Sequence, residues 1–144
     1  MKLTRLTRPR FVGVLGLLLL AAGLIAACGN DEPSGRVFFT GIEGGAQVTS
    51  PVKVGMGVEG LTVEPANGVR EGFGHHHILV DVGFTPFGQE IQKDIRHLHF
   101  GKGQTEASIE LEAGEHTLRL LFADGEHVPY NPLVSDVITI TVIE

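Results

Sequence analysis

The chain has 144 residues, with 17 Asp and Glu against 11 Lys and Arg, and a single cysteine at position 28. Four of the basic residues and none of the acidic ones precede Cys28, so the rest of the chain carries a net charge of about −10. This length supports one domain, and this charge excludes nucleic acid and anionic lipid headgroups as the main partner, because both would repel it.

The first 27 residues are typical of a bacterial secretory signal. Residues 1–10 hold the four basic side chains, and residues 11–27 contain no polar side chain. Residues 24–28 read Leu-Ile-Ala-Ala-Cys and resemble the bacterial lipobox, whose cysteine thiol takes a diacylglycerol before cleavage. The alternative is a permanent span, but as a helix this apolar run would rise about 25 Å, short of the roughly 30 Å hydrocarbon core.

We therefore expect a cleaved leader at residues 1–27, a lipidated Cys28 and a flexible tether over residues 28–35. The protein would be exported and held at a membrane by its lipid, facing the periplasm or the cell exterior. Acylation leaves no free thiol, so the domain has no disulfide and must be stabilised by packing.

Beyond the tether, short segments of alternating apolar and polar residues recur between Gly, Pro and Asn. We expect strands at residues 36–40, 48–59, 75–82, 95–100, 105–112, 116–123 and 136–143, with residues 61–65 as a continuation of the second. About seven or eight strands without Trp or a cysteine pair predict an all-β domain over residues 36–144, a single immunoglobulin-like β-sandwich.

Histidine is the side chain that stands out, because all seven histidines follow Cys28 and most are clustered. On a strand, residues i and i+2 share a face about 7 Å apart, so the sequence predicts two same-face pairs, His75 with His77 and His97 with His99. The two pairs could build a four-nitrogen metal site, with His127 as a further candidate ligand. Imidazole ligands, with Asp81 or Glu126 as an additional carboxylate, suit Zn(II), Cu(II) or Ni(II).

Other residues near these pairs are expected to have structural or secondary roles. His76 shares a strand face with apolar residues and is expected in the core, and His116 occupies a turn where a histidine can fix a corner by hydrogen bonding. The full secondary set is His76, Asp81, Gln104, Glu106 and His116.

Four motifs carry a family resemblance: residues 74–81 (Gly-His-His-His-Ile-Leu-Val-Asp), 97–106 (His-Leu-His-Phe-Gly-Lys-Gly-Gln-Thr-Glu), 114–118 (Gly-Glu-His-Thr-Leu) and 127–129 (His-Val-Pro). In order and spacing they resemble the bacterial proteins grouped as domain of unknown function 4399, over roughly residues 37–142. The resemblance implies a small exported protein and groups the histidines as one feature, without assigning an activity.

Three functions follow from these patterns. The first is a membrane-anchored module of the cell envelope whose histidine cluster binds a divalent transition metal, Zn or Cu. The second is a structural or protein-interaction module in which the histidines form a hydrogen-bonded network. The third is a metalloenzyme with an open metal position. Because the sequence holds neither a thiol nucleophile nor a convincing serine triad, we expect a binding protein rather than an enzyme.

Overall fold

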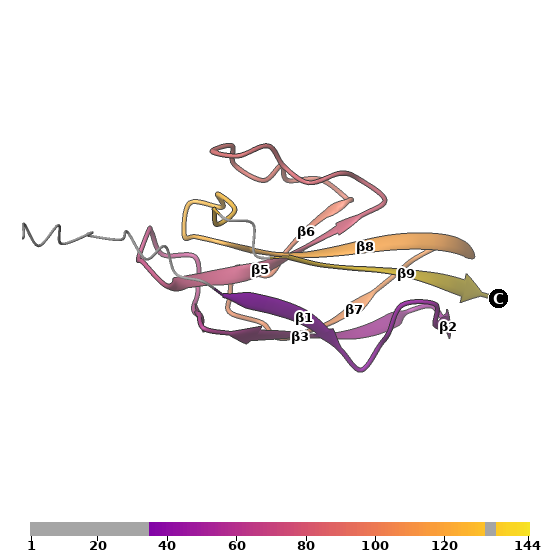
Figure 1. The fold of residues 1–144 in the computed structure, drawn as a ribbon. Coiled ribbons are helices and arrows are strands. Elements are labelled where there is room, and N and C mark those ends of the chain that lie inside the picture. The colour runs from indigo at the N-terminus through magenta and orange to yellow at the C-terminus, as the bar shows by residue number, and fades with distance from the viewer. Residues whose placement is uncertain (1–34, 132–134) are drawn as a thin grey trace, which may run out of the picture.

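The computed structural model describes residues 35–131 and 135–144. The predicted leader and Cys28 lie outside these residues, as does the predicted tether except for Gly35. In the described part, nine strands form two facing layers (Figure 1). They are β1 (Arg36–Thr40), β2 (Gln47–Thr49), β3 (Val52–Glu59), β4 (Thr62–Val63), β5 (Phe73–Val80), β6 (His97–His99), β7 (Glu106–Ile109), β8 (Gly114–Ala123) and β9 (Ser135–Ile143).

The two layers are a three-stranded sheet in the order β1-β3-β7 and a six-stranded sheet in the order β2-β9-β8-β5-β4, with β6 also paired to β5. Alternate residues of both sheets point inward and form one apolar core. Its buried members include Val37, Phe39, Val54, Met56, Ile78, Leu118, Leu120 and Ile140. The predicted all-β sandwich is confirmed. Among residues 35–131 and 135–144, no helix is long and apolar enough to span a membrane.

The predicted strand over residues 48–59 is two strands that belong to different sheets. β2 pairs with β9 in the larger sheet, and β3 pairs with β1 and β7 in the smaller one. The break falls at Ser50 and Pro51, where proline has no N–H to donate to a ladder. The chain therefore crosses from one layer to the other at this point.

β5 is buried on both faces, and this determines where the site lies. It pairs with β8 on one side and with β4 and β6 on the other, and its residues from Gly74 to Val80 are all buried. The inner face carries Ile78 and Val80 into the core between the sheets. The outer face, with Leu79, is covered by another part of the chain.

That cover is the connection of residues 81–96 between β5 and β6. Figure 1 shows it running over the larger sheet, on the side away from β1, β3 and β7. Ile91 is 1% exposed and packs with Leu79, Leu121 and Ala123 in a second, smaller apolar cluster. The Ile91 N–H also donates to the carbonyl of His127, at 2.9 Å. This connection is thus held over the sheet by the buried Ile91 side chain and by the backbone hydrogen bond from Ile91 to His127.

Candidate metal centre

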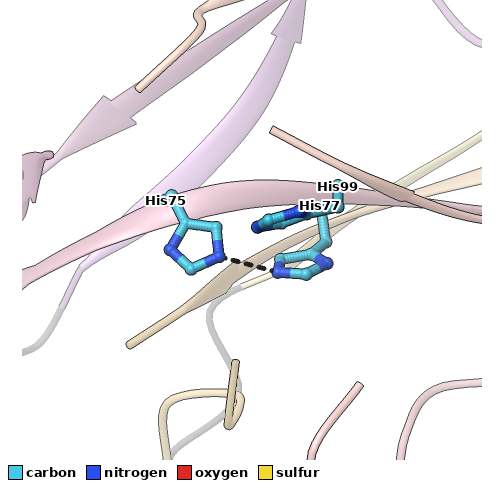
Figure 2. Close-up of side chains that lie close together, drawn as sticks. All are labelled: His75, His77 and His99. Atoms are coloured by element: carbon cyan, nitrogen blue, oxygen red, sulfur yellow. Dashed lines mark hydrogen bonds between the residues drawn. The ribbon is translucent and has the colours of Figure 1, made fainter. Parts of the chain in front are cut away.

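Three histidines meet on the outer face of the larger sheet (Figure 2). His75 and His77 alternate along β5 and so share a face. β6 runs antiparallel to β5 with His99 directly opposite His77, which brings a third imidazole to the same face. One nitrogen from each of these rings lies within 4.8 Å of the other two, so the three side chains could hold a metal ion.

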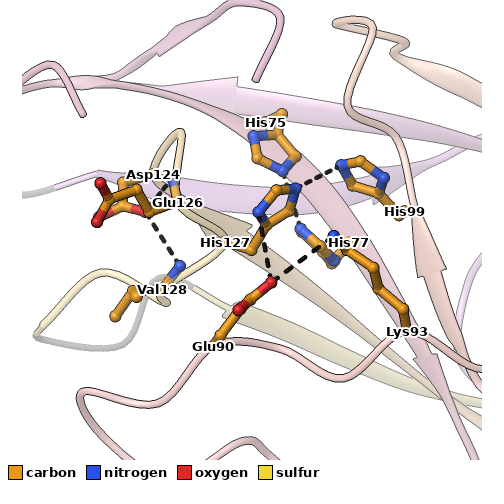
Figure 3. A network of polar contacts seen from close by, with 9 residues as sticks. All are labelled: His75, His77, Glu90, Lys93, His99, Asp124, Glu126, His127 and Val128. Atoms are coloured by element: carbon orange, nitrogen blue, oxygen red, sulfur yellow. Dashed lines mark hydrogen bonds and ion pairs between the residues drawn. The ribbon is translucent and has the colours of Figure 1, made fainter. Parts of the chain in front are cut away.

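A fourth ring, that of His127, lies against this group (Figure 3). It comes from the connection between β8 and β9, and its Nε2 is 3.1 Å from Nε2 of His99. The Nε2 atoms of His75 and His77 are 2.9 Å apart. Two nitrogens bound to one tetrahedral zinc are about 3.3 Å apart, so both contacts are close to the spacing of coordinated imidazoles.

His75, His77 and His99 are neutral at physiological pH. Burial lowers the pKa of His75 to about 4, with repulsion from His99 and His127 adding to the effect. Burial lowers the pKa of His77 to about 2, and repulsion from His75 and His99 acts in the same direction. The pKa of His99 is also lowered, first by desolvation and then by His127. Neutral imidazole is the form that binds metal, so these rings need no deprotonation at pH 7.

The buried rings leave polar atoms without partners. Nδ1 of His75 and Nδ1 of His77 are buried and have no hydrogen bond. A buried polar group without a partner costs roughly 1–3 kcal/mol, and four neighbouring imidazoles cannot all be satisfied by bonding to one another. His99 is the exposed member of the group, so the site is open to solvent on the β6 side. Each neutral imidazole also keeps one nitrogen lone pair, so the arrangement is suited to binding a cation.

The histidines of the site lie in a segment that matches a known family. The sequence matches the family described as domain of unknown function (DUF4399) over residues 54–143, which include all four histidines of the site. The chain belongs to this family. The resemblance expected from the four motifs is thereby confirmed. No match to the chain was found among curated proteins.

His76 of the DUF4399 domain points the opposite way from its two neighbours. It is fully buried, and its ring packs edge-on against Phe122 with 5.2 Å between ring centres. Neither of its ring nitrogens has a hydrogen bond. Burial lowers its pKa to about 4, so this histidine is a neutral member of the sandwich core.

His97 lies on β6 but is not a member of the three-histidine group. It pairs across the ladder with Leu79, two residues further along the strands than the His77–His99 pair. Its Nδ1 lies 2.8 Å from Oδ1 of Asp94, which also accepts the backbone N–H of His97. The turn before β6 therefore holds this ring against a carboxylate.

His116 and Asp81 form a corner that is separate from the metal site. β5 ends at Val80, and Asp81 turns away with a φ of 56°, so the predicted strand alternation stops before it. His116 Nδ1–H donates to Asp81 at 2.7 Å, and His116 Nε2–H donates to the carbonyl of Glu112 at 2.9 Å. The Asp81 hydrogen bond raises the pKa of His116 against a smaller opposing effect of burial. With both ring nitrogens bonded, this imidazole is not free to ligate.

Gln104 and Glu106 lie away from the histidines. Oε1 of Gln104 accepts the backbone N–H of Lys102 at 2.8 Å and so fixes the turn after β6. Glu106 is exposed on β7, in the other sheet, where it is paired with Gly55. Neither residue contributes to the cluster.

Two acidic residues beside the cluster were not anticipated from the sequence. Glu90 Oε1 lies 3.9 Å from Nδ1 of His127 and 3.7 Å from Nζ of Lys93. Asp124 Oδ1 accepts the backbone N–H groups of Glu126 and Val128 at 2.9 and 3.0 Å. The Asp-Gly pair at residues 124–125 is a turn signal, but no local pattern links Glu90 to a histidine 37 positions away.

Proposed function

We propose that this protein is a membrane-anchored metal-binding module of the cell envelope, which binds a divalent transition metal, Zn or Cu, through His75, His77 and His99. The observation that carries the proposal is the convergence of these three imidazoles from two neighbouring strands, with ligand nitrogens within 4.8 Å of one another. Imidazole suits both metals, and the two buried rings are neutral at pH 7.

The anchor is supported by the sequence. A basic start, an apolar run and Leu-Ile-Ala-Ala-Cys at residues 24–28 favour export and lipidation of Cys28. Two or more acyl chains give stable membrane attachment. The charge of about −10 on the mature chain favours cations near its surface. We infer a role in capture, buffering or delivery of the ion outside the cytoplasm.

The test is a calorimetric titration of the chain purified from cells in mild detergent and stripped of metal with EDTA. Zn(II) or Cu(II) should bind with a Kd below about 10 μM. His99→Gln removes an exposed ligand and should weaken binding at least about tenfold, whereas His97→Gln removes a histidine from the same strand and should bind like the wild type. Wild-type protein that binds neither metal would refute the proposal.

The alternative is a hydrogen-bonded histidine network in a structural or interaction module. It is favoured by the separations of 2.9 Å between His75 and His77 and 3.1 Å between His99 and His127, which are also hydrogen-bond distances. Under this alternative, His99→Gln would lower the stability of the metal-free protein, and added metal would leave the melting temperature of the wild type unchanged.

A further inference from the structure

The four rings at the centre are arranged as the corners of a tetrahedron. The six distances between the ring centres of His75, His77, His99 and His127 all lie between 4.7 and 5.8 Å. The two shortest nitrogen contacts, His75 with His77 and His99 with His127, are opposite edges of this figure. Six nearly equal distances among four points are possible only in a tetrahedral arrangement.

These distances can be compared with those of a coordinated metal. With a metal–nitrogen bond of about 2.1 Å, four imidazoles around a tetrahedral ion have ring centres about 5.2 Å apart, whereas a square arrangement gives four distances of about 4.5 Å and two of about 6.4 Å. The longest separation here, between His77 and His127, is 5.8 Å. The rings therefore match a tetrahedron rather than a square.

His127 is held in place by its own loop. Its φ of 66° is unusual for a residue with a side chain, and the Asp124 carboxylate fixes the loop around it by accepting two backbone N–H groups. The carbonyl of His127 accepts the N–H of Ile91, so the segment that carries Glu90 is tied to the same point.

The two nitrogens of His127 face different groups (Figure 3). Nε2 faces His99 at 3.1 Å, and Nδ1 faces the Glu90 carboxylate at 3.9 Å. A carboxylate on the far nitrogen of a ligating histidine is a recurrent feature of metal sites, where it orients the ring and increases its basicity. Resting on the proposed function, we propose that His127 is the fourth ligand of a closed tetrahedral centre and that Glu90 is the carboxylate that orients it.

This ligand set indicates both the ion and its use. Zn(II) has no geometric preference of its own and is usually tetrahedral in closed protein sites, whereas Cu(II) favours a tetragonal arrangement. The site therefore suits Zn(II) better than Cu(II). Four protein ligands leave no position for a reactive water, so the centre binds and releases zinc rather than catalysing hydrolysis.

The test uses the whole chain purified in mild detergent, stripped with EDTA and loaded with Zn(II) or with Co(II) as a visible probe. His127→Asn removes the ring while keeping a residue that tolerates positive φ, so the loop can keep its shape. We expect zinc affinity to fall about 100-fold and the intense visible absorption of four-coordinate Co(II) to weaken. His97→Asn is the matched control and should stay within about threefold of the wild type.

Two further measurements make the test specific. Glu90→Gln should weaken zinc binding about 10- to 100-fold, the usual cost of losing such a partner, whereas Glu126→Gln, an exposed acid beside His127, should not. Azide, which binds at open metal positions, should leave the Co(II) spectrum of the wild type unchanged. Melting curves in EDTA identify any variant whose fold is lost.

The outcomes separate this inference from the proposed function. If the wild type binds zinc and His127→Asn binds it equally well, or azide alters the wild-type Co(II) spectrum, the closed four-histidine centre is wrong and the three-histidine site stands. If Glu90→Gln binds like the wild type, the role of Glu90 is wrong. If the wild type binds no zinc or cobalt, the proposed function fails together with this inference.

Discussion

The metal-free domain should lose stability steeply when the pH falls from 7 to 5. His75, His76 and His77 are 0–1% exposed, and their pKa values are about 4, about 4 and about 2, against 6.5 for an ordinary histidine. Below pH 6.5 these three histidines therefore bind protons in the unfolded chain but not in the folded chain. The free energy of unfolding declines as the pH falls, until the pKa values of the folded state are reached.

The magnitude follows from these values. Between pH 7 and pH 5, each histidine contributes a loss of about 2 kcal/mol, so the three together contribute about 6 kcal/mol. This is comparable to the whole stability of many domains of this size. His116 acts in the opposite direction, because its raised pKa adds stability as the pH falls, and so reduces the net loss.

The assay is urea denaturation followed by far-ultraviolet circular dichroism at pH 5, 6, 7 and 8, with EDTA present throughout. His76→Leu keeps the core filled and removes one of the three groups, so the pH-dependent loss should shrink by about a third. A wild-type unfolding free energy that changes by less than about 1 kcal/mol between pH 7 and pH 5 would refute the reasoning, as would a His76→Leu profile as steep as that of the wild type.

Three more predictions follow from the centre, the corner and the leader. Free Zn(II) at 100 times its Kd should stabilise the protein by about 2.7 kcal/mol and raise the melting temperature by about 10 °C, and EDTA should reverse both effects. A melting temperature that does not change when zinc is added would contradict this prediction. His116→Ala should lower the free energy of unfolding by about 1–2 kcal/mol near pH 6 and by less at pH 9, because the His116 ring, whose pKa is raised, stabilises the fold by its charge only while it is protonated. Urea unfolding at pH 6 and pH 9 measures this difference, and an equal loss of stability at the two pH values would contradict it. Cys28→Ser should abolish acylation and leave uncleaved precursor, detected by fatty-acid labelling and mass spectrometry, and unchanged processing would count against lipidation.

The strands could largely be anticipated because alternation is a local property of the sequence. The positions of β1, β8 and β9 agree with the apolar pattern to within a residue or two. The division at Ser50 and Pro51 was missed because both segments alternate, and only the partner strand decides to which sheet each belongs. Proline was the one local signal available there.

The site could be anticipated only in part. His75 and His77 share a face because of strand geometry alone, and the structure brings them together with His99. His97 and His99 are equivalent in local pattern, so choosing between them requires the register of β6 on β5, which pairs His99 with His77 and His97 with Leu79. The approach of Glu90 to His127 depends on how two loops pack against each other, and the periodicity of the sequence carries no information about loop packing.

The register between β5 and β6 makes the short turn after β6 sensitive to insertion. A shift of one residue would move His99 to the inner face of the sheet, because successive side chains alternate. Gly101 adds a second restriction, since a side chain there would collide with the His99 ring. Members of the family that keep this centre should therefore tolerate length changes in residues 83–89, between the Asp81 corner and Glu90, while keeping the spacing from His99 to Gly101 fixed.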